Sequence, residues 1–306
     1  MEDSTNVPRE THNMKTYTNC PICDGTSFEN FLKCNDNTGS DEAFQIVKCV
    51  ECAFHFTNPI PLESEIGKYY ESDEYISHSN TSKGIVNFLY QKVRNYTLDK
   101  KVGLLGKLNG GKALLDIGSG TGEFLNRAVQ HGYQVDGIEP SKDARKQAIQ
   151  NFQVPVFEES HLSTLPSDSY DFITMWHVLE HVYHLNDRVA ELKRLIKKGG
   201  HILIAVPNLK SYDAQKYKEH WAAYDVPRHL YHFSETDIKS LALKHDLEVV
   251  QTLPMKFDSY YVSLLSEKYK SGQQNLVGAF LAGLKSNSVA QSGGGYSSQI
   301  YVIKSK

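Results

Sequence analysis

Four of the five cysteines form two pairs with the spacing of a metal site. The pairs are Cys20-Pro-Ile-Cys23 and Cys49-Val-Glu-Cys52, and twenty-five residues lie between them. Two residues between cysteines let both thiolates of a pair reach one tetrahedral ion at about 2.3 Å. Cys20, Cys23, Cys49 and Cys52 therefore predict a site for a structural zinc ion (Zn2+), because four protein ligands leave no position open for catalysis.

The residues around these pairs favour a zinc ribbon over a redox site. Strand-like apolar residues such as Phe44 and Phe54 flank the second pair. A redox CxxC pair opens a helix after a strand, whereas Gly25 follows the first pair almost directly. Cys34 or His55 remain alternatives for one of the four ligands, although a core thiol and a surface imidazole are the ordinary interpretation of both.

A glycine-rich loop follows a strand-like segment in the middle of the chain. It reads Leu-Leu-Asp-Ile-Gly-Ser-Gly-Thr-Gly over 114–122, with glycines at Gly118, Gly120 and Gly122. Glycine permits a tight turn and a close approach of the backbone to a ligand. The spacing is GxGxG rather than the GxGxxG of dinucleotide sites, and Asp116 precedes the loop. This carboxylate would repel a pyrophosphate but not a cationic sulfonium amino acid. The next strand ends in Glu139, which can accept hydrogen bonds from both ribose hydroxyls of an adenosine.

The elements that must position these residues alternate after Gly110. Strands are predicted over 112–117, 133–138, 154–157, 170–175, 201–206, 247–253 and 299–303, and helices over 122–131, 141–151, 185–196 and 235–244. This alternation implies a parallel sheet with helices on both faces. We expect a zinc-ribbon module with an N-terminal tail over 1–60, a lid and linker helix over 61–109, and an α/β domain over 110–306. A partly helical insertion precedes the last strand.

The motifs of the α/β domain resemble those of the class I S-adenosylmethionine-dependent methyltransferases, in particular the small-molecule branch of types 11, 12 and 23. LLDIGSGTGEFL is similar to the first motif of that family, and VDGIEPS to the second. YDFITMWHVLEHV resembles the strand-four motif, and GGHILIAVPN the strand-five segment. DVPRHLYHF, over 225–233, resembles the histidine-bearing segment that follows. The resemblance covers about residues 110–253, and four linked motifs in order make it specific.

The resemblance implies a Rossmann-like seven-stranded sheet with an antiparallel last strand, and S-adenosyl-L-methionine as cofactor. It implies that the cofactor is bound by Asp116, Gly118, Ser119, Gly120, Gly122, Glu139, Trp176 and His177. The adenine contact stays open among Glu158, Glu159 and His161. Relatives fold a lid over the cofactor from the segment before the domain, so Tyr75 and His78 are candidates to close the site.

Histidines supply the candidates for acid–base chemistry. Methyl transfer needs a general base only where the accepting atom is protonated at neutral pH, and histidine suits that role because its reference pKa is about 6.5. We predict His181, His229 and His232 as candidate catalytic residues. His229 and His232 have an equally good alternative, which is to hold their loop in place by hydrogen bonds.

Charge and length restrict the partners. The 306 residues contain 33 lysines and arginines against 36 aspartates and glutamates, a net charge of −3, which disfavours nucleic acid and anionic lipid. The basic segment 83–107 alone favours the alternative, a zinc-ribbon ribosomal RNA methyltransferase. We therefore predict a small-molecule acceptor: a sugar nucleotide, a lipid-linked intermediate or a natural-product intermediate. The longest apolar run, Leu276–Leu284, is too short for the roughly 20 residues of a membrane span, and the first ten residues lack a signal sequence, so we expect a cytoplasmic protein.

Overall fold

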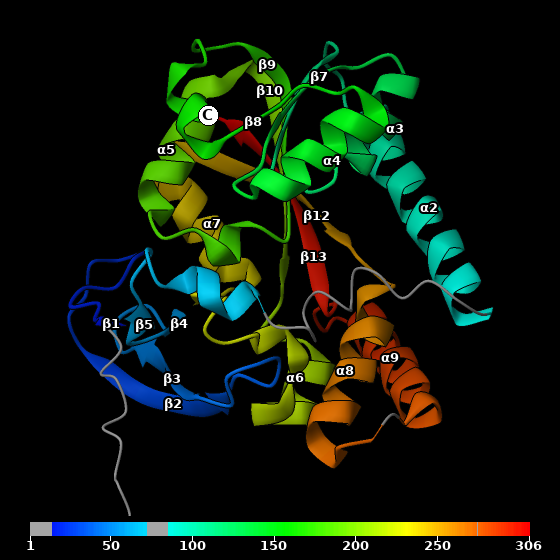
Figure 1. The fold of residues 1–306 in the computed structure, drawn as a ribbon. Helices are drawn as coiled ribbons and strands as arrows, with labels where there is room; N and C mark the ends of the chain where they lie inside the picture. The colour runs from blue at the N-terminus through cyan, green and yellow to red at the C-terminus, as the bar shows by residue number, and fades with distance from the viewer. Residues whose placement is uncertain (1–13, 72–84, 274) are drawn as a thin grey trace, which may run out of the picture.

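A seven-stranded sheet with helices on both faces forms the centre of the protein (Figure 1). The computed structural model describes residues 14–71, 85–273 and 275–306. The strands of this sheet are β6 (Ala113–Ile117), β7 (Gln134–Ile138), β8 (Val156–Phe157), β9 (Tyr170–Trp176), β10 (Ile196–Pro207), β12 (Leu247–Pro254) and β13 (Ser298–Ser305). Their order is β12-β13-β10-β9-β6-β7-β8. β13 runs in the opposite direction to the other six strands of this sheet, which confirms the predicted topology.

Helices cover the sheet because its central strands are apolar on both faces. The segments of β6, β9 and β10 are almost continuously buried, as expected for parallel strands between two helical layers. One face carries α2 (Ile85–Leu105), α3 (Glu123–Gln130) and α4 (Lys142–Phe152), and the other carries α5 (Leu185–Leu195) and α7 (Glu235–Lys244). A capping box begins α7, since the Ser234 amide donates to the Asp237 carboxylate at 2.7 Å.

The N-terminal residues form a smaller sheet that a later segment completes. Its strands are β2 (Phe28–Asn35), β3 (Ala43–Cys49) and β4 (His55–Thr57), and β1 (Met14–Lys15) pairs separately with β5 (Ile60–Pro61). The fourth strand of this sheet is β11 (Tyr231–His232), which comes from the PRHLYHF segment and pairs antiparallel with β4. Phe54 packs against Tyr231 and Phe233, with ring centroids 6.0 and 5.5 Å apart. The module and the α/β domain therefore share a sheet and a hydrophobic core.

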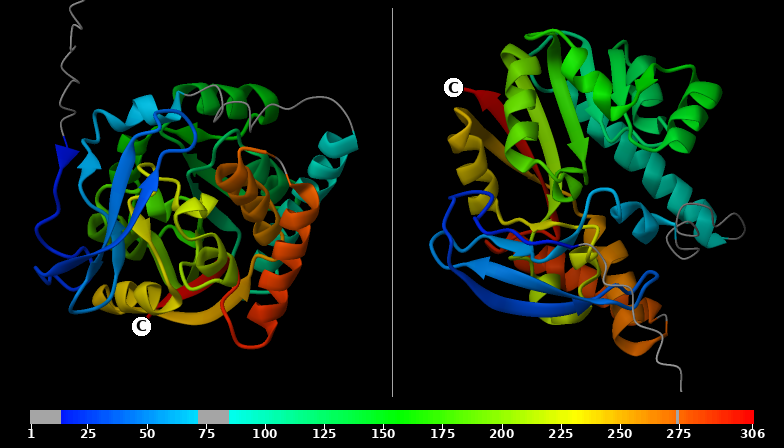
Figure 2. Two further views of the ribbon diagram at one scale, coloured as in Figure 1. Left: turned by 90° about the horizontal axis from the view of Figure 1, so that it is seen from below. Right: turned by 60° about the vertical axis from the view of Figure 1, so that its left-hand side comes forward.

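The remaining elements gather at one end of the large sheet, beside the N-terminal sheet (Figures 1 and 2). They are α6 (Tyr212–Tyr217), α8 (Asp258–Ser271) and α9 (Leu276–Gln291), together with the short 3-10 helices Ile66–Tyr70, Lys218–His220 and Ala222–Tyr224. Two further 3-10 helices, Glu159–Thr164 and Leu179–His181, lie in the large-sheet connections. The helices α8 and α9 form the predicted insertion before the last strand. Among the described residues, no helix combines the length and the apolar character that a bilayer crossing needs.

We expect Phe54→Ala to lower the free energy of unfolding of the whole chain by about 3–5 kcal/mol, the usual cost of truncating a buried phenylalanine. Phe54 is fully buried in the shared core, so the loss should shift one cooperative transition in scanning calorimetry. Phe31→Ala is the matched control, because Phe31 is 43% exposed. A transition of the α/β domain that stays at its wild-type temperature would contradict the shared core.

Candidate functional site

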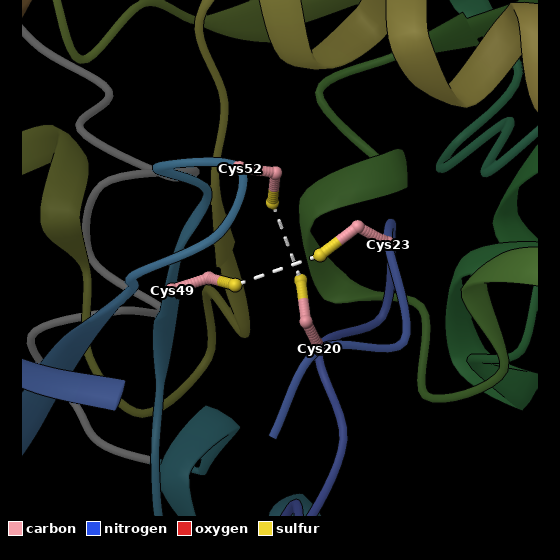
Figure 3. Close-up of side chains that lie close together, drawn as sticks. All are labelled: Cys20, Cys23, Cys49 and Cys52. Atoms are coloured by element: carbon pink, nitrogen blue, oxygen red, sulfur yellow. Dashed lines mark hydrogen bonds between the residues drawn. The ribbon is translucent and has the colours of Figure 1, made fainter. Parts of the chain in front are cut away.

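The four paired cysteines converge on one point between two turns of the N-terminal module (Figure 3). The sulfur atoms of Cys20 and Cys52 lie 3.6 Å apart, and those of Cys23 and Cys49 lie 3.5 Å apart. Four thiolates around a tetrahedral zinc ion at about 2.3 Å are separated by roughly 3.8 Å, so the cluster fits this ion. Cys34 lies outside the cluster of metal-ligating groups, as does His55, which packs on the Phe31 ring.

The cysteine module rests directly on the α/β domain. The carbonyl oxygen of Pro21, within the first cysteine pair, accepts a hydrogen bond from Asn186 at the start of α5. The carbonyl oxygen of Ile22 accepts one from Lys244 at the end of α7. The first metal-binding turn is therefore fixed to two helices that cover the large sheet.

The glycine-rich loop turns between β6 and α3, and its three glycines have backbone torsions that favour this residue. Gly118, Gly120 and Gly122 have φ of +75°, +54° and +85°. A Cβ atom at Gly118 would lie 2.3 Å from the Val178 side chain, and one at Gly122 would lie 2.8 Å from Ala148. Space is open at Gly120, where a ligand can approach the backbone. The contact with Val178 also places the segment after β9 directly against this loop.

Asp116 lies at the end of β6 in a setting that calls for a positive charge. Its carboxylate is buried and accepts a hydrogen bond from Thr174 at 2.5 Å. Burial raises the pKa of Asp116 to about 7, although Thr174 and the ammonium of Lys101 favour the charged form. Lys101, which the sequence analysis did not identify, extends from α2 over the Trp176 ring at 4.4 Å. A cationic ligand beside Asp116 would stabilise the carboxylate, which agrees with a sulfonium cofactor.

Further polar groups in this region suit a nucleoside ligand. The carboxylate of Glu139 accepts hydrogen bonds from the amides of Gly120 and Ser141, at 2.9 and 2.8 Å. These bonds hold it at the rim of the loop with acceptor capacity left for ribose hydroxyls. Ser119 Oγ and Trp176 Nε1 are buried without a hydrogen-bond partner among the described residues. Buried polar atoms of this kind are expected where a ligand completes the bonding, so the predicted residues fit S-adenosylmethionine.

His177 joins the β9 segment to the inserted helices. It has a φ of +57°, and its Nε2 atom lies 2.9 Å from Asp258 on α8. Its Nδ1 atom lies 3.5 Å from the carboxylate of Glu180. Burial alone would lower the pKa of His177, but the two carboxylates outweigh it and raise this pKa to about 9. His177 is therefore an imidazolium at neutral pH, close to Asp258 on one side and within ion-pair distance of Glu180 on the other.

Glu180, His181 and His229 form a cluster next to His177. One ligand-type atom from each of the three residues lies within 4.8 Å of the others. Glu180 is fully buried, and neither carboxylate oxygen has a hydrogen-bond partner among the described residues. Burial and the nearby His229 ring lower the pKa of His181 to about 4, so His181 is neutral at pH 7.

The His229 ring in this cluster is held in place by the backbone. Its Nδ1 atom lies 2.9 Å from the carbonyl oxygen of Ala223, so this nitrogen carries the proton in the neutral ring. Nε2 then keeps its lone pair and lies 3.8 Å from a carboxylate oxygen of Asp225. The ring of His181 packs edge-on against that of His229, with centroids 4.5 Å apart. A ring held at Nδ1, with its Nε2 atom next to a carboxylate, can take up a proton as a general base does, because the carboxylate stabilises the imidazolium that forms.

The structure places the fourth histidine elsewhere. His232 lies on β11, buried between the two halves of the chain, with Nε2 3.1 Å from the Thr57 hydroxyl. Burial lowers its pKa well below the ordinary value, so it is neutral. These contacts correspond to the predicted alternative in which the histidine holds its loop, and a catalytic role for His232 has no geometric support here.

Two groups of predicted residues remain undecided. Tyr75 and His78 lie outside the described residues. Among the candidates for the adenine contact, Glu159 pairs with Arg188, Glu158 accepts a hydrogen bond from Ser160, and His161 stacks on Phe157. Sequence reasoning also assigned no role to Glu180 and Asp225. Glu180 lies between two histidines in the HVLEHV motif, and this spacing is the feature of the sequence that could have identified it.

Comparison with known proteins shows the family of the chain. A family profile described as "Methyltransferase domain" matches residues 90–252, more than half of the chain. The chain is 32% identical over 128 residues to "Ubiquinone biosynthesis O-methyltransferase" of Vibrio cholerae serotype O1, a match that covers 39% of this chain and 50% of that protein. The protein of the same name from Photorhabdus laumondii is 32% identical over 123 residues, covering 37% and 48%. The chain thus spans about half the length of the curated relatives it matches.

A solved structure shares the fold at low identity. Magnesium protoporphyrin IX methyltransferase from Synechocystis PCC 6803, with bound SAH, aligns with a TM-score of 0.53 and 16% sequence identity. The alignment covers 80% of this chain and all of that one, which shows the same fold.

We expect Gly118→Ala to weaken the binding of S-adenosylmethionine at least tenfold, which corresponds to about 1.4 kcal/mol. The new methyl group would meet Val178 at 2.3 Å and push the loop away from the ligand. Gly132→Ala is the matched control, because its φ of +79° imposes the same backbone strain with no atom within 4 Å of the new Cβ. Isothermal titration calorimetry of both variants checks this, and equal affinities would contradict the position of the cofactor.

We expect Cys49→Ser to release the metal ion and lower the melting temperature, because a four-thiolate site loses one ligand. Metal analysis by inductively coupled plasma mass spectrometry should find one zinc per chain in the wild type and much less in the variant. Cys34→Ser should keep its zinc, since Cys34 lies outside the cluster. If Cys49→Ser retains one zinc per chain, the four-cysteine site is excluded.

Proposed function

The chain belongs to the methyltransferase-domain family, and from this premise we propose that it transfers the methyl group of S-adenosylmethionine to an oxygen atom of a small-molecule acceptor. The observation that carries the proposal is the His229 ring, held at Nδ1 by the Ala223 carbonyl oxygen and next to Asp225 at Nε2. It lies in a cluster with Glu180 and His181, which follow closely after Val178, the residue that touches the glycine-rich loop. A hydroxyl acceptor must lose its proton as it is methylated, and this cluster can receive it. The name of the Vibrio relatives, O-methyltransferase, supports the choice of oxygen.

The residues at the ends of β6 and β7 would bind the cofactor. Asp116 would face its positive end, and Glu139 would accept hydrogen bonds from the ribose. When bound, the cofactor supplies a methyl group on a sulfonium sulfur, which is already activated for displacement. The loop glycines let the backbone approach closely, and the Trp176 ring walls the same region beside Phe124, with ring centroids 5.4 Å apart. The contribution of these residues is to align the methyl group and exclude water.

The residues after β9 and β10 would bind the acceptor and take up its proton. His229 Nε2 accepts the hydroxyl proton, and Asp225 stabilises the resulting imidazolium. His181 is less suited to this step, because its lowered pKa makes it a weak base. His177 is an imidazolium whose two nitrogens face carboxylates, so its role is to hold α8 against the site. The acceptor therefore binds between the glycine loop, His229 and the inserted helices.

The four-thiolate cluster would hold a structural zinc ion. The ion would fix the turn that contacts α5 and α7, and it leaves no open coordination position for a substrate. The basic helix α2 gives limited support for RNA as substrate. Arg94 pairs with Glu123, and Lys101 points inward over Trp176, so these two cations are directed into the domain.

The test is a labelling experiment with methyl-labelled S-adenosylmethionine, the purified chain and a cell extract divided into small-molecule, lipid, RNA and protein fractions. We expect label in the small-molecule or lipid fraction, on an oxygen. His229→Gln should bind the cofactor as the wild type does but transfer label at least tenfold more slowly, about 1.4 kcal/mol in barrier height. The matched control, His184→Gln, alters an exposed histidine and should transfer at the wild-type rate.

Label in the RNA fraction would replace this proposal by the zinc-ribbon RNA methyltransferase. If His229→Gln transfers label at the wild-type rate, His229 is not the general base, and the methyltransferase assignment stays in place.

A further inference from the structure

Arg228 is a fully buried cation that connects the N-terminal module to the acceptor side of the site. Its Nη2 atom donates to Asp36 of the module at 2.8 Å and to Asp225 at 2.7 Å. Its Nε atom donates to the same oxygen of Asp225 at 3.0 Å. Its Nη1 atom donates to the carbonyl oxygen of Tyr69 at 2.8 Å. One side chain thus binds groups from three separate segments of the chain.

Groups other than the arginine already hold Asp36 in a fixed orientation. It is 1% exposed and lies at the end of β2, where the backbone amides and hydroxyls of Thr38 and Ser40 all donate to its carboxylate. Neighbours that bind the charged form lower the pKa of Asp36, with Arg228 foremost, although burial opposes them. A buried aspartate with this many donors is a rigid anchor for the guanidinium.

The same contacts determine where Asp225 points. Arg228 binds one carboxylate oxygen of Asp225, and the other lies 3.8 Å from His229 Nε2. The backbone of Asp225 has a φ of +37°, in the left-handed region that costs a non-glycine residue about 1 kcal/mol or more. Strain of this kind persists where surrounding contacts over-determine the conformation, and here those contacts come from Arg228.

We propose that Asp36 is a positioning residue for proton uptake at His229: through Arg228 it holds Asp225 with its second oxygen facing His229 Nε2. The inference rests on the proposed function, and it assigns the N-terminal module a part in the reaction. The module would then complete the acceptor site, in addition to carrying a metal ion. Thr57 of the same module supports this, because its hydroxyl donates to the carbonyl oxygen of His229 at 2.9 Å.

Several charged or titratable groups face His229 and define its electrostatic setting. They are Asp225 and Arg228 on its own segment, Glu180 and His181 from the segment after β9, and His232, whose own pKa responds to His229. Asp36 reaches His229 only through Arg228 and Asp225. Removing the charge of Asp36 leaves the positive charge of Arg228 less compensated. A protonated His229 then becomes less favourable, so its titration should move to lower pH.

The experiment measures the titration of His229 in the full-length chain, by NMR of 15N-labelled imidazoles, with His229→Gln used to assign the signal. Asp36→Asn should lower the midpoint by about half a pH unit or more, a modest shift on the scale of protein histidines. Asp36→Glu should titrate close to the wild-type midpoint, because it keeps the negative charge. Asp41→Asn is the matched control, since Asp41 is exposed on the same loop. In Asp41→Asn, the His229 signal should titrate with the wild-type midpoint.

Turnover gives a second readout once the acceptor fraction is known. Asp36→Asn should lower kcat about tenfold and leave the KM for S-adenosylmethionine unchanged. Combined with Asp225→Asn it should be no slower than Asp225→Asn alone, because both changes act on one chain of contacts.

A wild-type midpoint in folded Asp36→Asn, or additive losses in the double variant, would overturn the proposal and reduce Asp36 to a structural residue. If Asp36→Asn does not fold, Ser40→Ala decides. It keeps the charge of Asp36 but removes a hydroxyl donor that orients it, so Asp36 should hold Arg228 and Asp225 less firmly and the midpoint should move in the same direction by a smaller amount. An unchanged midpoint there would equally overturn it. These results differ from a failure of the proposed function, in which the wild type itself transfers no methyl group.

Discussion

The buried guanidinium of Arg228 is the constraint on which the two halves of this protein depend. A charge removed from water is tolerated only when its partners and hydrogen bonds are complete. Here the partners are Asp36, Tyr69 and Asp225, so the loss of any one of them would leave the buried charge less well compensated. The β4–β11 pairing and the shared aromatic core bring the same two halves together. The N-terminal module is consequently in direct contact with the segment that carries the proposed acceptor site.

Local patterns in the sequence were sufficient to predict most of the α/β domain. The glycine loop and the alternation of strands and helices depend on residues within about ten positions of one another, and the structure contains both. The cysteine pairs are a related case, because each pair forms within one turn. Residues that the sequence analysis missed, such as Lys101 and Glu180, act through partners far away along the chain. No spacing rule links Asp36 to Arg228, and β11 is only two residues long.

The histidines show why residue type alone could not assign roles. His177 and His181 are four positions apart in one motif, yet the pKa of the first is raised and that of the second is lowered. The difference arises from Asp258 on α8, about eighty residues downstream, whose carboxylate lies next to the His177 ring. The Nδ1 atom of His181 instead contacts a tyrosine hydroxyl and a backbone carbonyl oxygen. His229 and His232 diverge in the same way, because one faces Asp225 and the other faces Thr57.

Burying charged groups costs folding free energy, and this cost is itself an argument about function. Replacing a buried ion pair with well-packed apolar residues is often neutral or stabilising, so stability alone does not account for a network of this kind. Buried charged groups lie at two places beside the proposed site, the Asp116 end of β6 and the Asp225–His229 segment. Between them lies the segment after β9, which touches the glycine loop through Val178 and the inserted helices through His177. A methyl donor on one side and a proton acceptor on the other need such a division, because the first site must attract a cation while the second must leave a nitrogen lone pair unprotonated.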